Sequence, residues 1–176
     1  HENRNAQRNS EFLAAVSEDL AQLRTVDEIM QTVGARLGEH LNLSLCAFVE
    51  INESEDTSTV IYDWNREDVP SIVGVYHLRD YLSEDFQRVL RSGDVFVVRD
   101  VYSDSRTDGE KYEGLKIGSF VCVPLIRERK WRFMLNVHDS KPRNWREDEI
   151  ALAREVAARV WTRLERARAE EPAVER

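Results

Sequence analysis

The sequence predicts an α+β domain with a central antiparallel sheet of five or six strands, and with the N- and C-terminal helices on one face of that sheet. Three observations lead to this prediction. The chain has 176 residues, which is the size of one ordinary domain. Apolar residues recur at three- and four-residue steps near both ends of the chain and at two-residue steps between them. Short polar turns join the strand-like runs, which is typical of hairpins and antiparallel pairing.

Two helices are predicted in the first forty residues. Phe12, Val16 and Leu20 mark the apolar stripe of the first helix, and a second stripe runs from residue 26 to residue 37. Between the stripes, Thr25 and Glu28 match a capping box, in which the two side chains close unpaired amides at a helix start. The second helix is therefore expected to begin directly after Thr25.

The apolar period changes to two at residue 43, which predicts a strand over residues 43–51. Its longer aliphatic side, from Leu43 to Ile51, is expected to face the helices. Cys46 and Phe48 are then expected to face the opposite layer. A polar turn at residues 53–58 and an extended run at residues 59–64 complete a hairpin. Residues 65–81 fit no single period.

The second half of the chain predicts a short helix, a strand, a hairpin and a long last helix. Ser83 is expected to cap the short helix, which ends near Gly93. Residues 95–98 form a strand, and residues 103–114 form a surface loop or a short irregular helix. Residues 119–126 and 131–138 form a hairpin around the charged turn at 127–130. Apolar residues then recur at helical steps from residue 150 to about residue 171.

These elements predict a single domain over residues 10–171, a tail at residues 1–9, and a second tail or the start of a linker at residues 172–176. No apolar run approaches the roughly 20 residues that a membrane-spanning helix needs, so no membrane partner is expected. The formal net charge of −8 disfavours nucleic acid as a partner. Cys46 and Cys122 both lie inside apolar runs, which favours buried thiols in a reducing compartment and therefore a cytoplasmic protein.

Three stretches of the chain resemble the GAF domain family, the small-molecule-sensing module of bacterial signalling proteins. The first is the strand and loop at 97–107 (VVRDVYSDSRT), and the second is the strand at 118–125 (GSFVCVPL). In the third, at 131–149, His138 is followed by Pro142, Arg143, Trp145 and Glu149 before the last helix. The resemblance extends over residues 10–171 and is closest to the domains of two-component sensor histidine kinases and related regulators.

The resemblance implies a non-catalytic domain that senses an unknown small molecule and relays its presence through the terminal helices. The first and last helices of the family pair across a twofold axis and continue into neighbouring domains. A parallel homodimer and an adjacent effector domain are therefore implied as partners. Family members bind cyclic nucleotides, bilins, haem or amino acids, and some bind no ligand. A ligand-free module used only for dimerisation is the alternative function.

Three chemistries known in the family each require particular residues. Bilin attachment in the cyanobacterial branch uses a cysteine after the position of Asp100, and residues 103–115 contain none, although His138 falls where those relatives hold a histidine. The cyclic-nucleotide signature is not matched around Trp145. A methionine sulfoxide reductase of this fold needs exposed, activated thiols, whereas Cys46 and Cys122 are expected to be buried. We therefore expect no catalytic residue, no metal and no cofactor, with a bilin or haem sensor and a thiol-dependent reductase as lesser alternatives.

A small-molecule site requires amphipathic aromatic groups and a few polar ones, and we expect it on the sheet face away from the terminal helices, under the segment 65–115. The ligand-pocket candidates are Phe48, Tyr62, Trp64, Tyr76, Tyr81, Arg99, Asp100, Arg106, Phe120, Cys122 and His138. The apolar face of the last helix is wider than packing against a single sheet would bury, which favours a helical dimer. The candidates for the dimer contact are Phe12, Val16, Val156, Val160, Trp161 and Leu164.

Overall fold

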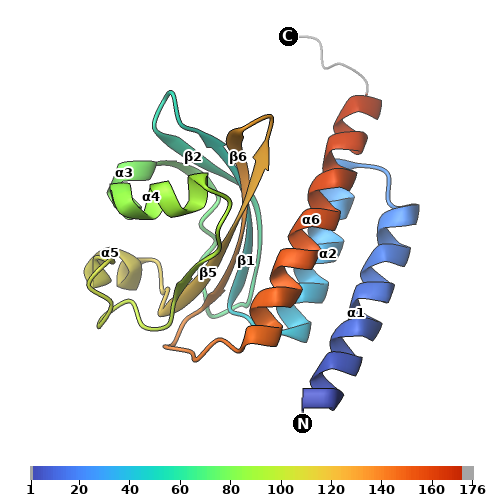
Figure 1. Ribbon diagram of the computed structural model, residues 1–176, viewed down its shortest axis with the longest axis horizontal. Coiled ribbons are helices and arrows are strands. Elements are labelled where there is room, and N and C mark those ends of the chain that lie inside the picture. Colours follow the sequence, from blue (N-terminus) through green and yellow to red (C-terminus); the bar gives the residue numbers. More distant parts are fainter. Residues whose placement is uncertain (1, 172–176) are drawn as a thin grey trace.

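A six-stranded antiparallel sheet runs through the middle of the molecule and separates two groups of helices (Figure 1). The computed structural model describes residues 2–171, so His1 and the predicted tail at 172–176 lie outside the described residues. Within that range the strand order is β3-β2-β1-β6-β5-β4, and the predicted α+β fold is confirmed. The strands are β1 (Leu45–Asn52), β2 (Thr57–Asn65), β3 (Gly74–His77), β4 (Phe96–Val98), β5 (Ser119–Arg127) and β6 (Lys130–Asp139).

The helices that begin and end the described chain share one face of the sheet, as predicted. On this face, α2 and α6 pack on the strands, and α1 packs on the outer side of α2 and α6 (Figure 1). The short helices α3, α4 and α5 lie on the opposite face. The helices are α1 (Glu2–Gln22), α2 (Val26–His40), α3 (Leu78–Tyr81), α4 (Glu84–Arg91), α5 (Gly109–Gly114) and α6 (Glu147–Glu170).

Local side-chain signals set the starts of two helices. At α2, the Glu28 backbone amide donates to Thr25 Oγ1 at 3.1 Å and the Thr25 amide donates to Glu28 Oε1 at 3.2 Å, which completes the predicted capping box. At α4, the Phe86 amide donates to Ser83 Oγ at 3.2 Å. Both caps satisfy amides that the helix itself leaves unpaired, and both confirm the predicted boundaries.

The two predicted hairpins are confirmed, and the segments without a clear period acquire structure. Strands β1 and β2 pair antiparallel, as do β5 and β6. Residues 65–81, which fit no single pattern, include the edge strand β3 and the single turn α3. Within the predicted loop 103–114, residues 109–114 form the helix α5. Residues 2–9, expected to form a tail, are the first turns of α1.

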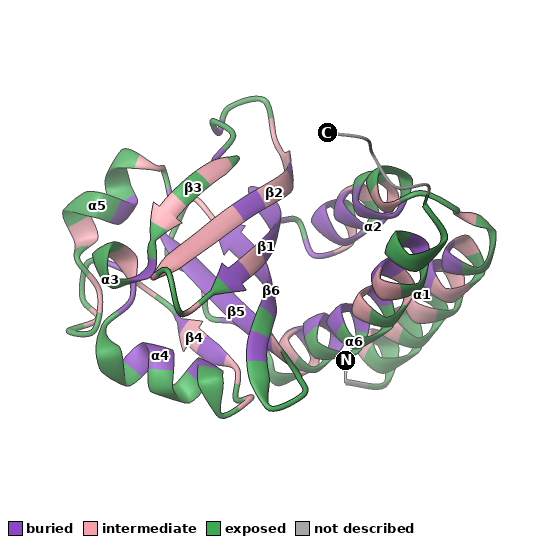
Figure 2. Ribbon diagram, turned by 90° about the horizontal axis from the view of Figure 1, so that it is seen from above, coloured by how far each residue is buried: buried purple, intermediate pink, exposed green. Residues whose placement is uncertain are grey.

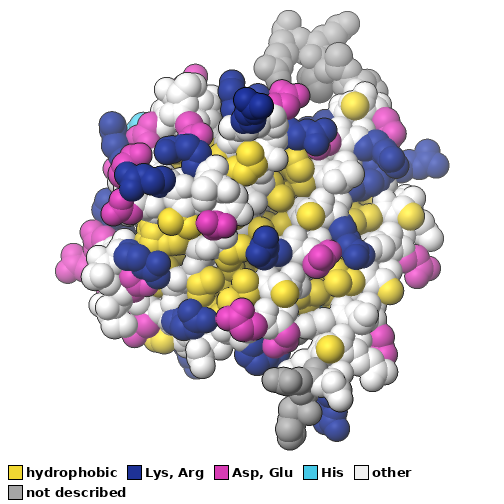
Figure 3. Space-filling model, in the orientation of Figure 1, with side chains coloured by type: hydrophobic (Ala, Val, Ile, Leu, Met, Phe, Trp, Pro, Cys, Tyr) yellow, Lys and Arg dark blue, Asp and Glu magenta, His cyan; other side chains and the backbone are white. Residues whose placement is uncertain are grey.

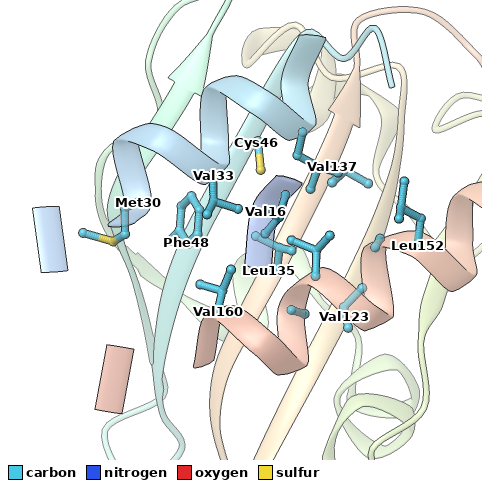
Figure 4. Close-up of a cluster of buried hydrophobic side chains, with 14 of the residues drawn as sticks. Val16, Met30, Val33, Cys46, Phe48, Val123, Leu135, Val137, Leu152 and Val160 are labelled. Carbon is cyan, nitrogen blue, oxygen red and sulfur yellow. The ribbon is translucent and has the colours of Figure 1, made fainter. Parts of the chain in front are cut away.

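Both faces of the sheet are buried (Figure 2), and they form two separate apolar cores. The helix-side core lies between α1, α2, α6 and one face of the sheet, and Figure 4 shows its side chains converging from helices and strands. The cavity-side core lies between the other face and α3, α4 and α5. Among the side chains labelled in Figure 4 are Val16, Met30, Val33, Cys46, Phe48, Val123, Leu135, Val137 and Val160.

The predicted orientation of β1 is wrong. Cys46 and Phe48 belong to the helix-side core, whereas Leu45, Ala47 and Val49 belong to the cavity-side core. An alternating strand has one polar face only when that face meets water. Here both faces of β1 are covered, so its alternation contains no signal that identifies which side meets the helices.

Candidate functional site

A cavity lies between the face formed by β1, β2, β5 and β6 and a cover formed by the edge strand β3, the helices α3 and α5 and the loops beside them. Its volume is about 80 Å³. Among its lining residues, Ser58, Tyr76, Tyr81 and Leu115 are partly exposed and form the rim, while the others are buried. The cavity thus reaches from a partly exposed rim to the sheet.

The sheet forms the floor of the cavity and the segment from residue 72 to residue 117 forms its cover. Floor residues come from four adjacent strands, and cover residues come from β3, α3, α5 and the loops beside them. Within residues 2–171, no charged side chain lines the cavity. The floor residues are Val49, Ser58, Val60, Phe120, Cys122, Met134, Asn136 and His138, and the cover residues are Ile72, Tyr76, Leu78, Tyr81, Leu82, Tyr112, Leu115 and Ile117.

Aromatic rings make up much of the cover. Tyr76 and Tyr81 meet edge to face with ring centroids 5.5 Å apart, and Tyr81 meets Tyr112 in the same way at 6.0 Å. Tyr112 in turn stacks on Phe120 at 5.2 Å. The Tyr76 hydroxyl donates to the Ile72 carbonyl at 2.6 Å, and the Tyr112 hydroxyl donates to the Tyr81 carbonyl. These hydroxyls hold the cover together, so Tyr76 and Tyr112 present mainly ring surface to the cavity.

Asp63 attaches the cover to the sheet. Its carboxylate is only 8% exposed and accepts hydrogen bonds from the Ser71 hydroxyl at 2.9 Å and from the Ile72 amide at 2.7 Å. A buried carboxylate is stable when such donors surround it. Asp63 is therefore a positioning residue that places Ile72 and the start of β3 over the floor.

Two polar side chains on β6 point into this apolar setting. Asn136 and His138 are 9% and 4% exposed. Asn136 Oδ1 and His138 Nδ1 have no hydrogen-bond partner among the described residues. Burial lowers the pKa of His138 to about 4, because the low-dielectric interior disfavours the charged imidazolium. At neutral pH the floor therefore presents a neutral imidazole and an amide.

Five of the predicted pocket residues line the cavity. They are two tyrosines of the cover and three floor residues from β5 and β6. Among these five residues, His138 has a buried polar atom without a hydrogen-bond partner, Nδ1. The Cys122 thiol is only a weak hydrogen-bonding group. The five are Tyr76, Tyr81, Phe120, Cys122 and His138.

Phe48, Tyr62 and Trp64 lie on the other face of the sheet, in or against the helix-side core. The pairing of β1 with β2 shifts by one residue between Phe48 and Val49, which leaves Ile61 as an extra residue in β2. Such a bulge moves the following side chains to the opposite face of the sheet. For this reason Val60 faces the cavity while Tyr62 and Trp64 face the helices.

Arg99, Asp100 and Arg106 hold the loop after β4 and do not line the cavity. Arg99 donates to Asn144 Oδ1 and to the Trp145 carbonyl, each at 3.2 Å, and Asp100 Oδ1 accepts from the Tyr102 amide at 2.9 Å. These bonds fasten the loop to the start of α6 and close a turn within it.

Arg106 stabilises the same loop through three contacts. It donates to the Val97 carbonyl at 2.9 Å, pairs with Asp104, and lies 4.8 Å from the centre of the Phe86 ring. The hydrogen bonds from Arg106 lower the pKa of Asp104. Arg106 is therefore a structural residue.

Sequence reasoning missed most of the cavity, and Asn136 was the one omission with a visible signal. Asn136 is a lone polar residue inside the apolar run of β6. Tyr112 and the cover residues near Leu78 lie in segments without a clear period. The lining residues that were not predicted are Val49, Ser58, Val60, Ile72, Leu78, Leu82, Tyr112, Leu115, Ile117, Met134 and Asn136.

The two thiols are separated by the sheet. Cys46 lies in the helix-side core and Cys122 in the cavity-side core, and both are free and buried. Burial raises the pKa of each thiol, so the reactive thiolate is disfavoured at neutral pH. In residues 2–171, no group of three histidine, cysteine or acidic side chains is placed to hold a metal ion.

The residues predicted for a dimer contact lie mainly inside the chain's own core. The candidates on α1 and those on α6 pack within the same chain, because α1 covers the side of α6 that the sheet leaves free. Trp161 alone among them is partly exposed, and its ring stacks on Phe133 at 4.7 Å. The five buried residues are Phe12, Val16, Val156, Val160 and Leu164.

No helix in the described part of the chain combines the length and the apolar character that crossing a membrane requires.

Comparisons with known proteins agree on one family. A family model described as GAF domain matches residues 24–165. The phycocyanobilin-bound GAF domain from a cyanobacterial phytochrome has 17% identity and a TM-score of 0.78, over 93% of this chain and 97% of that one. A GAF domain from a phosphoenolpyruvate-protein phosphotransferase of Coxiella burnetii has 15% identity and a TM-score of 0.75, over 94% and 98%.

The structure of an enzyme is also similar to this chain. The free methionine-R-sulfoxide reductase from Neisseria meningitidis, in complex with its substrate, has 15% identity and a TM-score of 0.74, over 93% of this chain and 92% of that one. No curated protein sequence matches the chain. Identities this low establish a shared fold and leave the ligand to be argued from the site itself.

Proposed function

This chain belongs to the GAF domain family, and on that premise we propose that it is a non-catalytic small-molecule sensor of a cytoplasmic two-component signalling protein. The ligand binds in the cavity between the sheet and its cover. Its presence shifts the population of two arrangements of α1 and α6, which pass the change to an effector domain of the same protein.

One observation carries this proposal: two unpartnered polar atoms lie at the floor of an otherwise apolar cavity. A buried polar atom without a partner lowers stability, and a ligand that supplies the partner regains part of that free energy. Asn136 Oδ1 and His138 Nδ1 are such atoms. A floor used only for packing would gain stability from apolar side chains at both positions.

The strands that form the floor also support the helices, which provides the route of the signal. On β6, Asn136 and His138 face the cavity, while Leu135 and Val137 belong to the helix-side core. A ligand that displaces β6 therefore changes the packing of α6 directly. The Arg163 guanidinium on α6 donates to the Leu20 carbonyl of α1 at 2.9 Å, so α1 follows α6.

The proposed assembly is a parallel homodimer through the outer faces of α1 and α6. Small side chains of both helices, Ser17, Ala21, Ala158 and Thr162, line a shallow groove there. Hydrophobic side chains also gather in the middle of the face in Figure 3, over α6 and the neighbouring strands. Light scattering at high micromolar concentration is expected to give twice the chain mass of 20.5 kDa. A monomer would contradict the dimer and leave the sensing proposal standing.

A module used only for dimerisation is the second candidate, and the size of the cavity favours it. The 80 Å³ of open space is small because Tyr81, Tyr112 and Phe120 fill much of the region. In this second candidate the aromatic side chains occupy the position of a ligand, and the helices act without a chemical input.

Tetrapyrrole and reductase functions fit these residues less well. A bilin or haem has several times as many atoms as this cavity holds, and the Cys122 thiol, the one thiol at the cavity, is buried with a raised pKa. A thiol reductase needs a thiolate and a resolving thiol, and the sheet separates Cys122 from Cys46. A visible absorption spectrum and an assay of thiol-dependent turnover test these two alternatives.

A thermal-shift screen with nucleotides, amino acids, tetrapyrroles and small neutral compounds separates the two main candidates. A sensor is expected to be stabilised by at least one compound, and the same compound is expected to change hydrogen exchange in α6 and α1. If the domain is used only for dimerisation, none of the compounds is expected to raise its melting temperature. Stabilisation without any change in the helices would contradict the proposed route of the signal.

A further inference from the structure

The lining of the cavity restricts the chemistry of its ligand, and the restriction rests on the function proposed above. Two groups of lining residues matter: the aromatic cover, and the polar pair on β6. A ligand must match both at once, in a space that excludes large molecules.

Charge is the first restriction. The lining consists of aliphatic, aromatic and sulfur-containing side chains together with Ser58, Asn136 and His138. Burial keeps the His138 imidazole neutral at physiological pH by lowering its pKa. A carboxylate, phosphate or ammonium group bound here would lose its hydration and gain no opposite charge from the described lining, which is a large penalty.

Shape is the second restriction. Tyr81, Tyr112 and Phe120 present ring faces and edges around the space, an arrangement that suits a flat aromatic guest. The cavity volume of about 80 Å³ is roughly half of the ~150 Å³ that encloses one benzene molecule, so a single ring is the largest guest and part of it lies in the open rim.

Hydrogen bonding is the third restriction. Asn136 and His138 are two residues apart on β6, so their side chains stand side by side, about 7 Å apart along the strand. Asn136 Oδ1 lacks a donor, and the neutral imidazole of His138 offers one donor and one acceptor nitrogen. A ligand with an amide or hydroxyl group at one edge would satisfy this pair.

We propose that the cavity binds an uncharged, single-ring aromatic molecule whose one polar edge, an amide or a hydroxyl, bonds to Asn136 and His138. The ring packs beside the stacked pair of Tyr112 and Phe120 and against Tyr81. The polar edge reaches the floor, and the rim at Ser58 and Tyr81 admits the ligand.

Benzamide, benzoate and benzamidine test the charge restriction, because they share one shape and are neutral, anionic and cationic at pH 7. Isothermal titration calorimetry is expected to detect benzamide, with the two ions at least about hundredfold weaker. Equal binding of benzoate or benzamidine would overturn the proposal. Phenol serves as a second neutral probe with a hydroxyl edge.

Asn136→Leu tests the polar edge. The substitution removes a buried atom without a partner, so the protein is expected to fold with unchanged or increased stability. Benzamide affinity is expected to fall about tenfold, the effect of one hydrogen bond, while toluene affinity is retained. Toluene binding as tightly as benzamide to the wild-type protein, or benzamide affinity that Asn136→Leu leaves unchanged, would overturn the role of the pair.

The outcomes also separate this inference from the function on which it rests. If charged or larger compounds stabilise the protein and the neutral single-ring probes do not, the ligand class is wrong and the sensor function stands. If no compound of any class stabilises it, both fail and dimerisation remains as the function.

Discussion

His138 and Asn136 show how much the role of one residue depends on its surroundings. On a partly exposed strand either side chain would bond to water. In the cavity floor their unpartnered atoms are buried, so they lower stability until a ligand or a water molecule supplies the missing bonds. For His138 the same burial also makes stability depend on pH.

Acid is expected to destabilise the protein through His138. The pKa of His138 is about 4 in the folded protein and near 6.5 in the unfolded chain, so the unfolded state binds the proton first as the pH falls. Stability from this group is complete above pH 6.5 and is lost as the pH falls towards 4. The difference corresponds to about 3 kcal/mol at 1.36 kcal/mol per pH unit.

Urea denaturation at pH 7, 6, 5 and 4 measures this effect, with His138→Leu as the matched variant. The wild-type protein is expected to lose about 3 kcal/mol more than the variant between pH 7 and pH 4. All the carboxylates titrate in both proteins, so their contribution cancels. Parallel curves for the two proteins would contradict a buried neutral His138.

For single residues, the sequence indicated which kinds of side chain lie near the sheet better than it indicated the face of the sheet to which each one points. Of the aromatic and histidine side chains predicted for the pocket, those on β3, α3, β5 and β6 line the cavity. Tyr62 and Trp64 were not, because a single extra residue in β2 turns them to the helices. A bulge depends on the pairing partner, and no local pattern in β2 indicates it.

At the scale of elements, two glycines of α2, Gly34 and Gly38, lie against Trp64 of β2. A Cβ on Gly34 would lie 3.1 Å from Trp64 Cβ, and a Cβ on Gly38 would lie 2.2 Å from Cε3 and Cζ3 of the Trp64 ring. The two glycines are one helical turn apart on the same face of α2. They allow the helix to lie directly against the indole.

Gly38→Ala is expected to lower the free energy of unfolding by about 1–3 kcal/mol, because the added methyl group forces the Trp64 ring or α2 to move. Gly114→Ala is the matched control, since a Cβ there meets no atom within 4 Å. In α5 that substitution is expected to leave stability unchanged or to raise it by up to about 1 kcal/mol. Chemical denaturation of both variants measures the difference, and equal stabilities would show that α2 can shift freely.

Elements with their own periodicity or caps were predicted from the sequence, and elements defined by distant partners were not. The capping box at Thr25 and the serine cap at Ser83 are local, so the starts of α2 and α4 could be found. The edge strand β3 has four residues, and its position depends on the Asp63 carboxylate and on pairing with β2. Such contacts between distant segments leave no periodic pattern in residues 65–81.

For the whole molecule, the main departure from expectation is the role of α1. Its apolar stripe was predicted for a dimer contact, yet Phe12, Val16 and Leu20 are buried against the chain's own helices. Sequence periodicity identifies an apolar face and does not reveal whether that face meets the same chain or a second copy. The helix therefore belongs to the folded protomer.

Val16→Asp is expected to unfold the protomer or to destabilise it by about 3–5 kcal/mol, because it places an unpaired charge in the helix-side core. Ala14→Asp, exposed on the same helix, is expected to change stability by less than about 0.5 kcal/mol. Circular dichroism melts measure stability, and light scattering measures mass. A folded monomer with Val16→Asp would place Val16 at an interface between copies instead.

The alternation along β6 separates the positions that are free to vary from those that must stay constant. Even-numbered residues 134, 136 and 138 line the cavity, whereas odd-numbered residues 133, 135 and 137 support the helices. Substitutions at even positions therefore alter the lining of the cavity and leave the helical layer unchanged. A library of variants restricted to those positions would change the shape and polarity of the cavity on a constant scaffold, and divergence between homologous GAF domains is open to the same route.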